Sequence, residues 1–148
     1  MSESVQVKFE LLREGFSLPE KKTSGAGAYD IRSASDAEII LQPGERKAIP
    51  TGLRVEIPQG FILSVRPRSG LAINEGLTMV NSPGTIDSDF RGEIQVLTIN
   101  LGNKPVTIQP HDRIAQLILE KTYEIEWVDT ALAQTERGES GFGSTGKH

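Results

Sequence analysis

The chain of 148 residues contains no cysteine, which excludes both a disulfide framework and a metal site built from thiolates. It has only two histidines, too few for a zinc site. No apolar run approaches the length of a membrane-spanning helix. Residues 1–15 alternate polar and apolar side chains and lack the apolar block of a signal peptide. We therefore expect a cytoplasmic protein with no membrane partner.

The charge pattern also lacks a dominant sign. The net charge is -4, and acidic and basic residues are interspersed along the chain. A protein that binds a nucleic-acid backbone usually carries a basic patch or stripe, so no nucleic-acid partner is expected. An anionic ligand would have to be held by a small local site.

Short stretches of alternating apolar and polar residues run along most of the chain. This alternation is typical of strands that bury one face, and turn-forming glycines and prolines separate the stretches. Many short strands at this spacing predict an all-β sandwich, barrel or jelly roll. The predicted strands are residues 5–11, 38–41, 53–57, 61–66, 77–80, 93–100, 106–109, 113–120 and 123–128. Only residues 70–75 favour a helix, which Ser69 could cap and Gly76 could end.

The tail contains most of a phosphate-binding P-loop, because residues 141–147 read G-x-x-x-x-G-K. A P-loop opens a helix, and a Ser or Thr follows its lysine. Here His148 follows Lys147 in place of Ser or Thr, and no helix is expected behind the glycines. Taken alone, the tail would therefore be expected to be a disordered terminus.

Five segments differ from generic strands and turns. They are GAGAYDIRSA at 25–34, RPRSGLA at 66–72, NSPGTIDSDFRGEI at 81–94, HDRIAQLIL at 111–119 and RGESGFGSTGKH at 137–148. In this order and spacing they resemble the five motifs of the homotrimeric dUTPases over nearly the whole chain. The resemblance implies a jelly-roll-like body of residues 1–132 and a glycine-rich arm of residues 133–148. The arm would close over the active site of a neighbouring subunit.

The resemblance implies an enzyme that hydrolyses dUTP to dUMP and pyrophosphate with Mg²⁺. Such an enzyme keeps uracil out of DNA and supplies dUMP for dTTP synthesis. Asp87 is the implied catalytic residue, which positions and deprotonates the water that attacks the α-phosphorus. Asp30 is expected to reach Mg²⁺ through water, without a direct protein ligand to the metal. The implied assembly is a homotrimer with its active sites at subunit interfaces.

Phosphate contacts are expected from the start of the predicted helix. A helix start offers unpaired amide groups, and Arg68, Ser69 and Gly70 occupy it. The resemblance adds Gln116, on a strand whose other side chains are mostly apolar. Taken alone, Ser69 could be only a cap, and Gln116 could simply face solvent.

Recognition of the base and the sugar is expected in the segment 81–94. The resemblance places Asn81 at the uracil pocket, and the backbone of Gly84, Thr85 and Ile86 could present amide and carbonyl groups to a flat base. Gly84 and Gly92, which flank residues 85–91, favour a bent hairpin that approaches a ligand closely. Phe90 stands where the family usually has Tyr, and its ring would pack under deoxyribose and exclude a 2'-hydroxyl.

The resemblance also gives the arm a role in binding. Phe142 would stack on uracil, while Arg137, Gly143, Ser144 and Thr145 would wrap the outer phosphates. Glycines let backbone amides approach oxygen atoms closely, so this cradle needs no helix behind it.

Two other functions remain open at this point. A dCTP deaminase, or a bifunctional dCTP deaminase and dUTPase, uses a glutamate in its pocket hairpin, whereas here Glu93 follows only after Arg91 and Gly92. A non-enzymatic trimeric jelly-roll module would explain the strands but not the tail. Individual residues have plainer explanations as well, since Asp30 could pair with Arg32 and Asp89 could serve turn formation. No role is assigned to His111.

Overall fold

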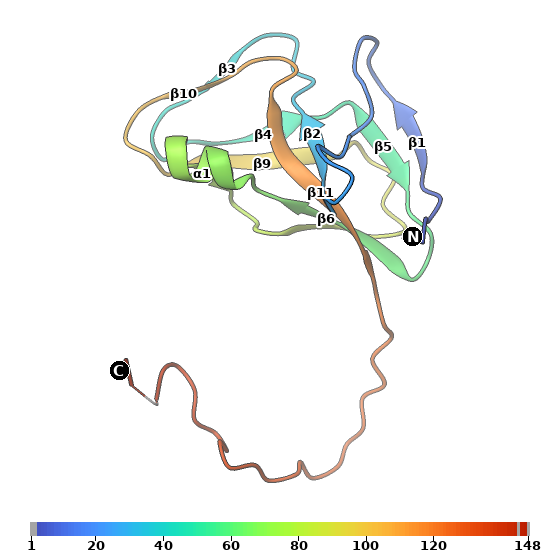
Figure 1. Ribbon diagram of the computed structural model, residues 1–148, viewed down its shortest axis with the longest axis vertical. Helices are drawn as coiled ribbons and strands as arrows, with labels where there is room; N and C mark the ends of the chain where they lie inside the picture. The colour runs from blue at the N-terminus through green and yellow to red at the C-terminus, as the bar shows by residue number, and fades with distance from the viewer. Residues whose placement is uncertain (1–2, 145, 148) are drawn as a thin grey trace.

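Figure 1 shows the computed structural model of the chain, which describes residues 3–144 and 146–147. The strands of this part are β1 (Lys8–Leu11), β2 (Tyr29–Arg32), β3 (Ile39–Leu41), β4 (Arg46–Pro50), β5 (Leu53–Glu56), β6 (Phe61–Arg66), β7 (Leu77–Met79), β8 (Gly84–Ile86), β9 (Gln95–Asn100), β10 (Val106–Ile108) and β11 (Arg113–Lys121). A short helix, α1 (Ser69–Glu75), lies between β6 and β7. The predicted all-β class is therefore confirmed.

The strands form small antiparallel sheets around one apolar core, in a jelly-roll-like arrangement. Their strand orders are β2-β11-β6-β8, β4-β9-β7, β1-β5 and β10-β3. Leu41, Ile49, Val96 and Ile108 are fully buried or nearly so, and each comes from a different strand. Burying such a side chain contributes about 1.5–3 kcal/mol. The inward residues of these strands thus hold the sheets together.

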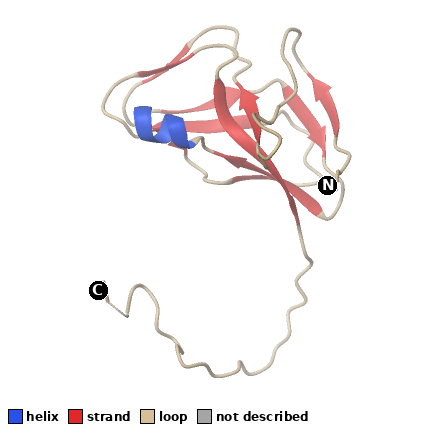
Figure 2. Cartoon of the chain, viewed as in Figure 1, coloured by secondary structure: helices blue, strands red, loops and turns tan. Residues whose placement is uncertain are grey.

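The periodicity failed in segments that bury few side chains. It missed β2 and β4, in which only Ile31 and Ile49, respectively, are fully buried. It also wrongly predicted a strand at 123–128, where the chain has no regular structure (Figure 2). Tyr123 and Trp127 are 83% and 86% exposed there. A strand needs a neighbour for its backbone groups, and this segment has none among the described residues.

The helix start differs from the prediction by one residue. Arg68 occupies the N-cap position with extended backbone, φ -94 and ψ 132, and Ser69 is already helical. No side chain caps the helix, so the expected cap by Ser69 is wrong. The predicted stop at Gly76 is confirmed by its φ of 70. A Cβ on Gly76 would lie 2.5 Å from the backbone nitrogen of Gly102, so this close approach also requires glycine.

The segment 81–94 is not the expected hairpin. Its first limb, β8, pairs with β6, whereas the following strand, β9, pairs with β4 and β7. Residues 87–94 therefore cross from one sheet to another. This crossing places the turn after β8 beside the two-stranded sheet of β1 and β5, where Arg91 contacts Glu56.

Beyond β11 the chain leaves the body. The backbone nitrogen of Thr122 still donates to the carbonyl of Gly60 at 2.8 Å, and the chain then runs outward in an open arc (Figure 1). The division at residue 132 remains a prediction. In the described part of the chain, no helix is long and apolar enough to cross a membrane.

Candidate active site

Asp30 lies between two arginines from distant parts of the sequence. Its carboxylate oxygens are 3.5 Å from Nε of Arg68 and 3.4 Å from Nη1 of Arg113. Nη1 of Arg68 also donates to the backbone carbonyl of Arg113 at 3.2 Å. We call Asp30, Arg68 and Arg113 the arginine cluster. The alternative pairing of Asp30 with Arg32 is wrong, because Arg32 donates to the carbonyl of His111 at 2.8 Å.

Gln116 joins this cluster through the strand register. On β11 it lies opposite Asp30 of β2 on one side and opposite Arg66 of β6 on the other. Its Nε2 donates to the carbonyl of Pro67 at 3.2 Å, just before the helix. Ser69 and Gly70 are exposed at the first positions of α1. The fold therefore brings the predicted phosphate-contacting residues of the body together.

The turn after β8 presents Asp87 and Phe90. The backbone nitrogen of Phe90 donates to the carbonyl of Asp87 at 3.2 Å and closes the turn. Phe90 is 43% exposed, and its ring lies against Gly92, where an added Cβ would be 2.6 Å from Cζ. Asp87 is exposed and lines an open hollow. The other residues that line the hollow are Gln6, Lys8, Glu56, Ile57, Pro58, Gln59, Ser88, Asp89 and Arg91.

Asn81 lies near the start of β8. A Cβ on Gly84 would be 3.0 Å from Nδ2 of Asn81, so the amide group packs closely on this glycine. Thr85 lies opposite Ser64 of β6 and is exposed, while Ile86 is partly buried. The residues expected to recognise the base thus form one short edge segment, directly before the turn of Asp87.

The turn and the arginine cluster lie apart within one chain. Ile86 lies opposite Leu63 of β6, and Asp87 continues past it, whereas Arg68 follows Arg66 at the other end of that strand. At about 3.3 Å per residue, Leu63 and Arg66 are already about 10 Å apart. Asp87 and Arg68 are further apart still.

The arm forms a third group. Nε of Arg137 donates to the carbonyl of Ser140 at 2.8 Å, and the nitrogen of Ser144 donates to the carbonyl of Gly141 at 3.1 Å. Phe142 is fully exposed and has a positive φ of 52. Gly143 also has a positive φ, while Thr145 lies outside the described residues. Among described residues, no hydrogen bond or ion pair joins the arm to the body.

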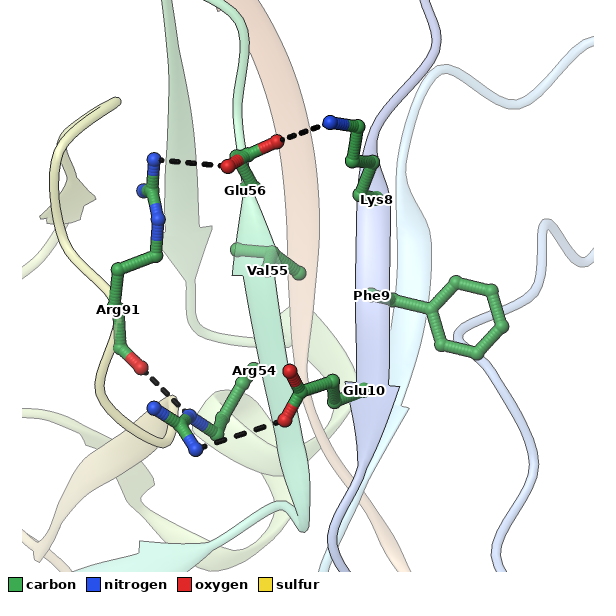
Figure 3. Close-up of a pocket in the computed structure, with 7 residues that line it drawn as sticks. All are labelled: Lys8, Phe9, Glu10, Arg54, Val55, Glu56 and Arg91. Carbon is green, nitrogen blue, oxygen red and sulfur yellow. Dashed lines mark hydrogen bonds and ion pairs between the residues drawn. The ribbon is translucent and has the colours of Figure 1, made fainter.

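Charged residues near Asp87 form a network that the sequence pattern did not reveal (Figure 3). Lys8 contacts Glu56 at 2.9 Å and lowers the pKa of its carboxyl, and Arg91 adds to this lowering. The stabilisation by these ion pairs is present above the ordinary pKa and is lost as pH falls through the lowered value. The sequence could not show this ion pair beforehand. The pair depends on the pairing of β1 with β5, which places Lys8 opposite Glu56.

The residues present suit an indirect contact with a metal ion. In the described part of the chain, no group of three or more His, Cys, Asp or Glu could hold one. Asp30 directs both carboxylate oxygens to arginines, which disfavours direct chelation. Each oxygen retains further acceptor capacity, so a water of a hydrated cation could still bind to it.

Known proteins resemble this chain over nearly its whole length. The family model for dUTPases matches residues 14–146. The deoxyuridine 5'-triphosphate nucleotidohydrolase of Fusobacterium nucleatum subsp. nucleatum is 51% identical over 144 residues, which cover 97% of this chain and 98% of that protein.

Two solved structures show the same fold. The dUTPase of Staphylococcus bacteriophage 80alpha with dUpNHpp matches with a TM-score of 0.85 and 26% identity, over 97% of this chain and 100% of that one. A mutant dUTPase of phage phi11 of S. aureus, whose structure concerns the coordination of a structural Mg(II) ion, matches with a TM-score of 0.75 and 23% identity. These regions cover 94% of this chain and 99% of the phi11 chain.

The family resemblance inferred from the five segments is thereby confirmed. Neither a dCTP deaminase nor a non-enzymatic module is favoured, because the family model and the half-identical relative are both dUTPases. The matched region contains every residue of the arginine cluster and of the turn that carries Asp87. This chain therefore belongs to the dUTPase family of enzymes.

Proposed function

We propose that the enzyme hydrolyses dUTP to dUMP and pyrophosphate, with Asp87 as the general base. The observation that supports this proposal most directly is the exposed carboxylate of Asp87, which lines an open hollow in the same turn as Phe90. A cytoplasmic location is part of the proposal, because the substrate class is a precursor of DNA. The activity would limit uracil in DNA and supply dUMP.

In the proposed reaction, Asp87 accepts a hydrogen bond from one water molecule. The water oxygen forms a bond to the α-phosphorus, and the bond from that phosphorus to the bridging oxygen of the β-phosphate breaks. Asp87 takes the proton of the water, and pyrophosphate leaves with the electron pair of the broken bond. A carboxylate at hydrogen-bond distance can orient the water and accept its proton in the transition state.

The arginine cluster supplies the positive charge for the phosphates. Arg68 is held from two sides, by the carboxylate of Asp30 and by the carbonyl of Arg113, so its guanidinium is oriented before substrate binds. Gln116, Ser69 and Gly70 add polar groups beside it. Donors fixed in advance stabilise developing charge without reorganisation during the reaction.

Mg²⁺ fits this site through water molecules on Asp30. When bound, the ion would neutralise charge on the phosphate oxygens and help to orient the triphosphate. Removal of divalent cations with EDTA is expected to lower turnover of dUTP at least about tenfold, since such charge stabilisation contributes several kcal/mol. Pyrophosphate release measures the effect, and excess Mg²⁺ should restore it. An unchanged rate in EDTA would remove Mg²⁺ from the proposal.

Selectivity for deoxyribose is assigned to the ring of Phe90. The ring lies against Gly92 and remains 43% exposed, so it can form a surface under a sugar. Phe90→Ala is expected to reduce the ratio of kcat/KM for dUTP over UTP by about tenfold or more, because the space for a 2'-hydroxyl opens. The control Phe90→Tyr keeps the ring and should keep the ratio. Equal discrimination in the alanine variant would refute the steric explanation.

We further propose that the active site forms between subunits of a homotrimer. Asp87, the arginine cluster and the arm lie in three separate places on one chain, yet the reaction requires all three groups around one substrate. The segment 123–128 also exposes apolar side chains, among them Ile125 and Trp127. An exposed apolar segment of this kind is typical of a surface that another subunit covers.

One assay separates this function from its rivals. Purified enzyme is given dUTP and dCTP, and release of both pyrophosphate and ammonia is followed. A dUTPase releases pyrophosphate from dUTP and no ammonia from either nucleotide. Ammonia from dCTP would indicate a deaminase, and the absence of both products would favour a non-enzymatic module.

A further inference from the structure

Arg91 holds the turn of Asp87 and Phe90 by its own side chain. Its Nη1 donates to the carbonyl of Ser88 at 2.6 Å and to the carbonyl of Phe90 at 3.1 Å. These carbonyls lie on either side of Asp89, inside the turn that begins at Asp87. The guanidinium group of Arg91 therefore binds two backbone carbonyls of the same turn.

Residues of β5 bind Arg91, and residues of β1 pair with those residues (Figure 3). Nη2 of Arg91 contacts Oε1 of Glu56 at 3.3 Å, and Oε2 of Glu56 contacts Lys8 at 2.9 Å. Nε of Arg54 donates to the backbone carbonyl of Arg91 at 2.7 Å, and Arg54 also pairs with Glu10 at 3.6 Å. The side chain and the backbone of Arg91 are thus tied separately to the sheet of β1 and β5.

The strand register makes this arrangement regular. Lys8 lies opposite Glu56, and Glu10 lies opposite Arg54, so opposite charges face each other at alternate positions of the two strands. Paired residues on one face of antiparallel strands lie close enough to interact directly. The sheet thereby presents Glu56 and Arg54 to the turn in fixed positions.

We infer that Arg91 is a positioning residue for Asp87 and Phe90, and that Glu56, itself held by Lys8, orients Arg91. This inference rests on the proposed roles of Asp87 and Phe90. The two strands β1 and β5 would then support catalysis without contacting substrate. Misplacement of a catalytic group by about 1 Å can lower a rate by roughly 10²-fold, so a support of this kind has large kinetic effects.

The network is unlike one that serves stability alone. The side chains of Arg91 and Glu56 are 49% and 42% exposed, and exposed ion pairs contribute little to the stability of a fold. Loss of either charge is therefore expected to shift Tm by no more than about 4 °C. A large fall in kcat with a small shift in Tm is the expected pattern for a positioning role.

The test compares Arg91→Gln, Arg91→Lys and Glu56→Gln in the full-length enzyme. We expect kcat for dUTP to fall about tenfold or more in Arg91→Gln and less in Glu56→Gln, with a smaller change in KM. The amide hydrogen of Phe90, bonded to the carbonyl of Asp87, should exchange at least about threefold faster in both variants, as measured by NMR without ligand. Lysine cannot reproduce the guanidinium fork, so Arg91→Lys should not restore either quantity.

Arg46 provides the matched control. It is exposed on β4, and its side chain forms no hydrogen bond or ion pair with the described residues. Arg46→Gln should leave kcat, KM and the exchange of the Phe90 amide unchanged. The double variant Glu56→Gln with Arg91→Gln should be no slower than Arg91→Gln alone, because both changes remove the same interaction between Glu56 and Arg91.

Two results would overturn the inference. Exchange at Phe90 that is unchanged in both Arg91→Gln and Glu56→Gln would show that neither side chain holds the turn. A fall in kcat for Arg91→Gln with unchanged exchange would make Arg91 a direct substrate contact.

If Arg91→Gln fails to fold, the same measurements on Glu56→Gln test the inference. If the wild-type enzyme does not hydrolyse dUTP, the proposed function fails, while the exchange experiment still decides whether Arg91 holds the turn.

Discussion

Asp87→Asn is expected to lower kcat for dUTP by roughly 10²-fold or more, because asparagine keeps the shape of the side chain but cannot accept the proton of the attacking water. Asp87 is exposed at the edge of its hollow, so the exchange of one oxygen for a nitrogen should leave the fold intact. The KM for dUTP should change little, since in the proposed site other residues would bind the phosphates and the base. Steady-state release of pyrophosphate and direct binding of dUTP measure the two quantities.

Asp89→Asn is the matched control for this experiment. Asp89 lies two residues further along the same turn, is exposed, and lines the same hollow. Its removal changes the local charge by the same amount, so any effect of charge alone would appear in both variants. We expect Asp89→Asn to retain a rate near that of the wild type. Turnover near the wild-type rate in Asp87→Asn would remove Asp87 from the mechanism.

Removal of the arm after Thr135 is also expected to lower turnover by roughly 10²-fold or more. The truncation deletes Arg137, Phe142 and the glycine-rich turn, and with them the lid that would exclude water and complete the positive charge around the phosphates. The arm makes no hydrogen bond or ion pair to the body among the described residues, so the truncated chain should fold with an unchanged Tm. Thermal unfolding and pyrophosphate release test the two statements.

Mixing the two inactive variants shows which subunit the arm serves. Asp87→Asn and the truncated chain are refolded together in equal amounts, and mixed trimers are confirmed by mass. If the arm closes over a neighbour, about one quarter of the sites will combine an intact Asp87 with an intact arm from another subunit. Activity should then return to about a quarter of that of the wild type. Confirmed mixed trimers without activity would refute the exchanged arm.

A truncated enzyme that keeps the full rate of dUTP hydrolysis would contradict a catalytic role of the arm. The arm would then be a terminus without a catalytic role, as its composition alone suggests. Parallel titration of dUTP binding distinguishes a role in binding from one in turnover, because loss of the stacking ring of Phe142 should raise the KM as well. An increase in KM without a fall in kcat would restrict the arm to substrate binding.

The sequence by itself determined the strands that bury every second side chain. β5 and β9 were predicted within two residues at each end, because buried residues such as Val55 and Val96 recur with the period of a strand. The same local information showed the helix and its end at Gly76, where a left-handed residue is needed. The order of the five segments was also a property of sequence alone, and it was enough to indicate the family.

Tertiary structure decided what depends on partners far away in the chain. The segment 123–128 alternates like a strand but is not one here, because no neighbouring strand completes its backbone hydrogen bonds within the described residues. Asp30 pairs with Arg68 and Arg113 rather than with nearby Arg32, since the register of β2 and β11 brings Asp30 and Gln116 together. Side-chain periodicity records which face of a strand is buried, but it carries no information on which strand lies beside it. For the same reason, only the pairing of β1 with β5 could show that Lys8 and Glu56 form an ion pair.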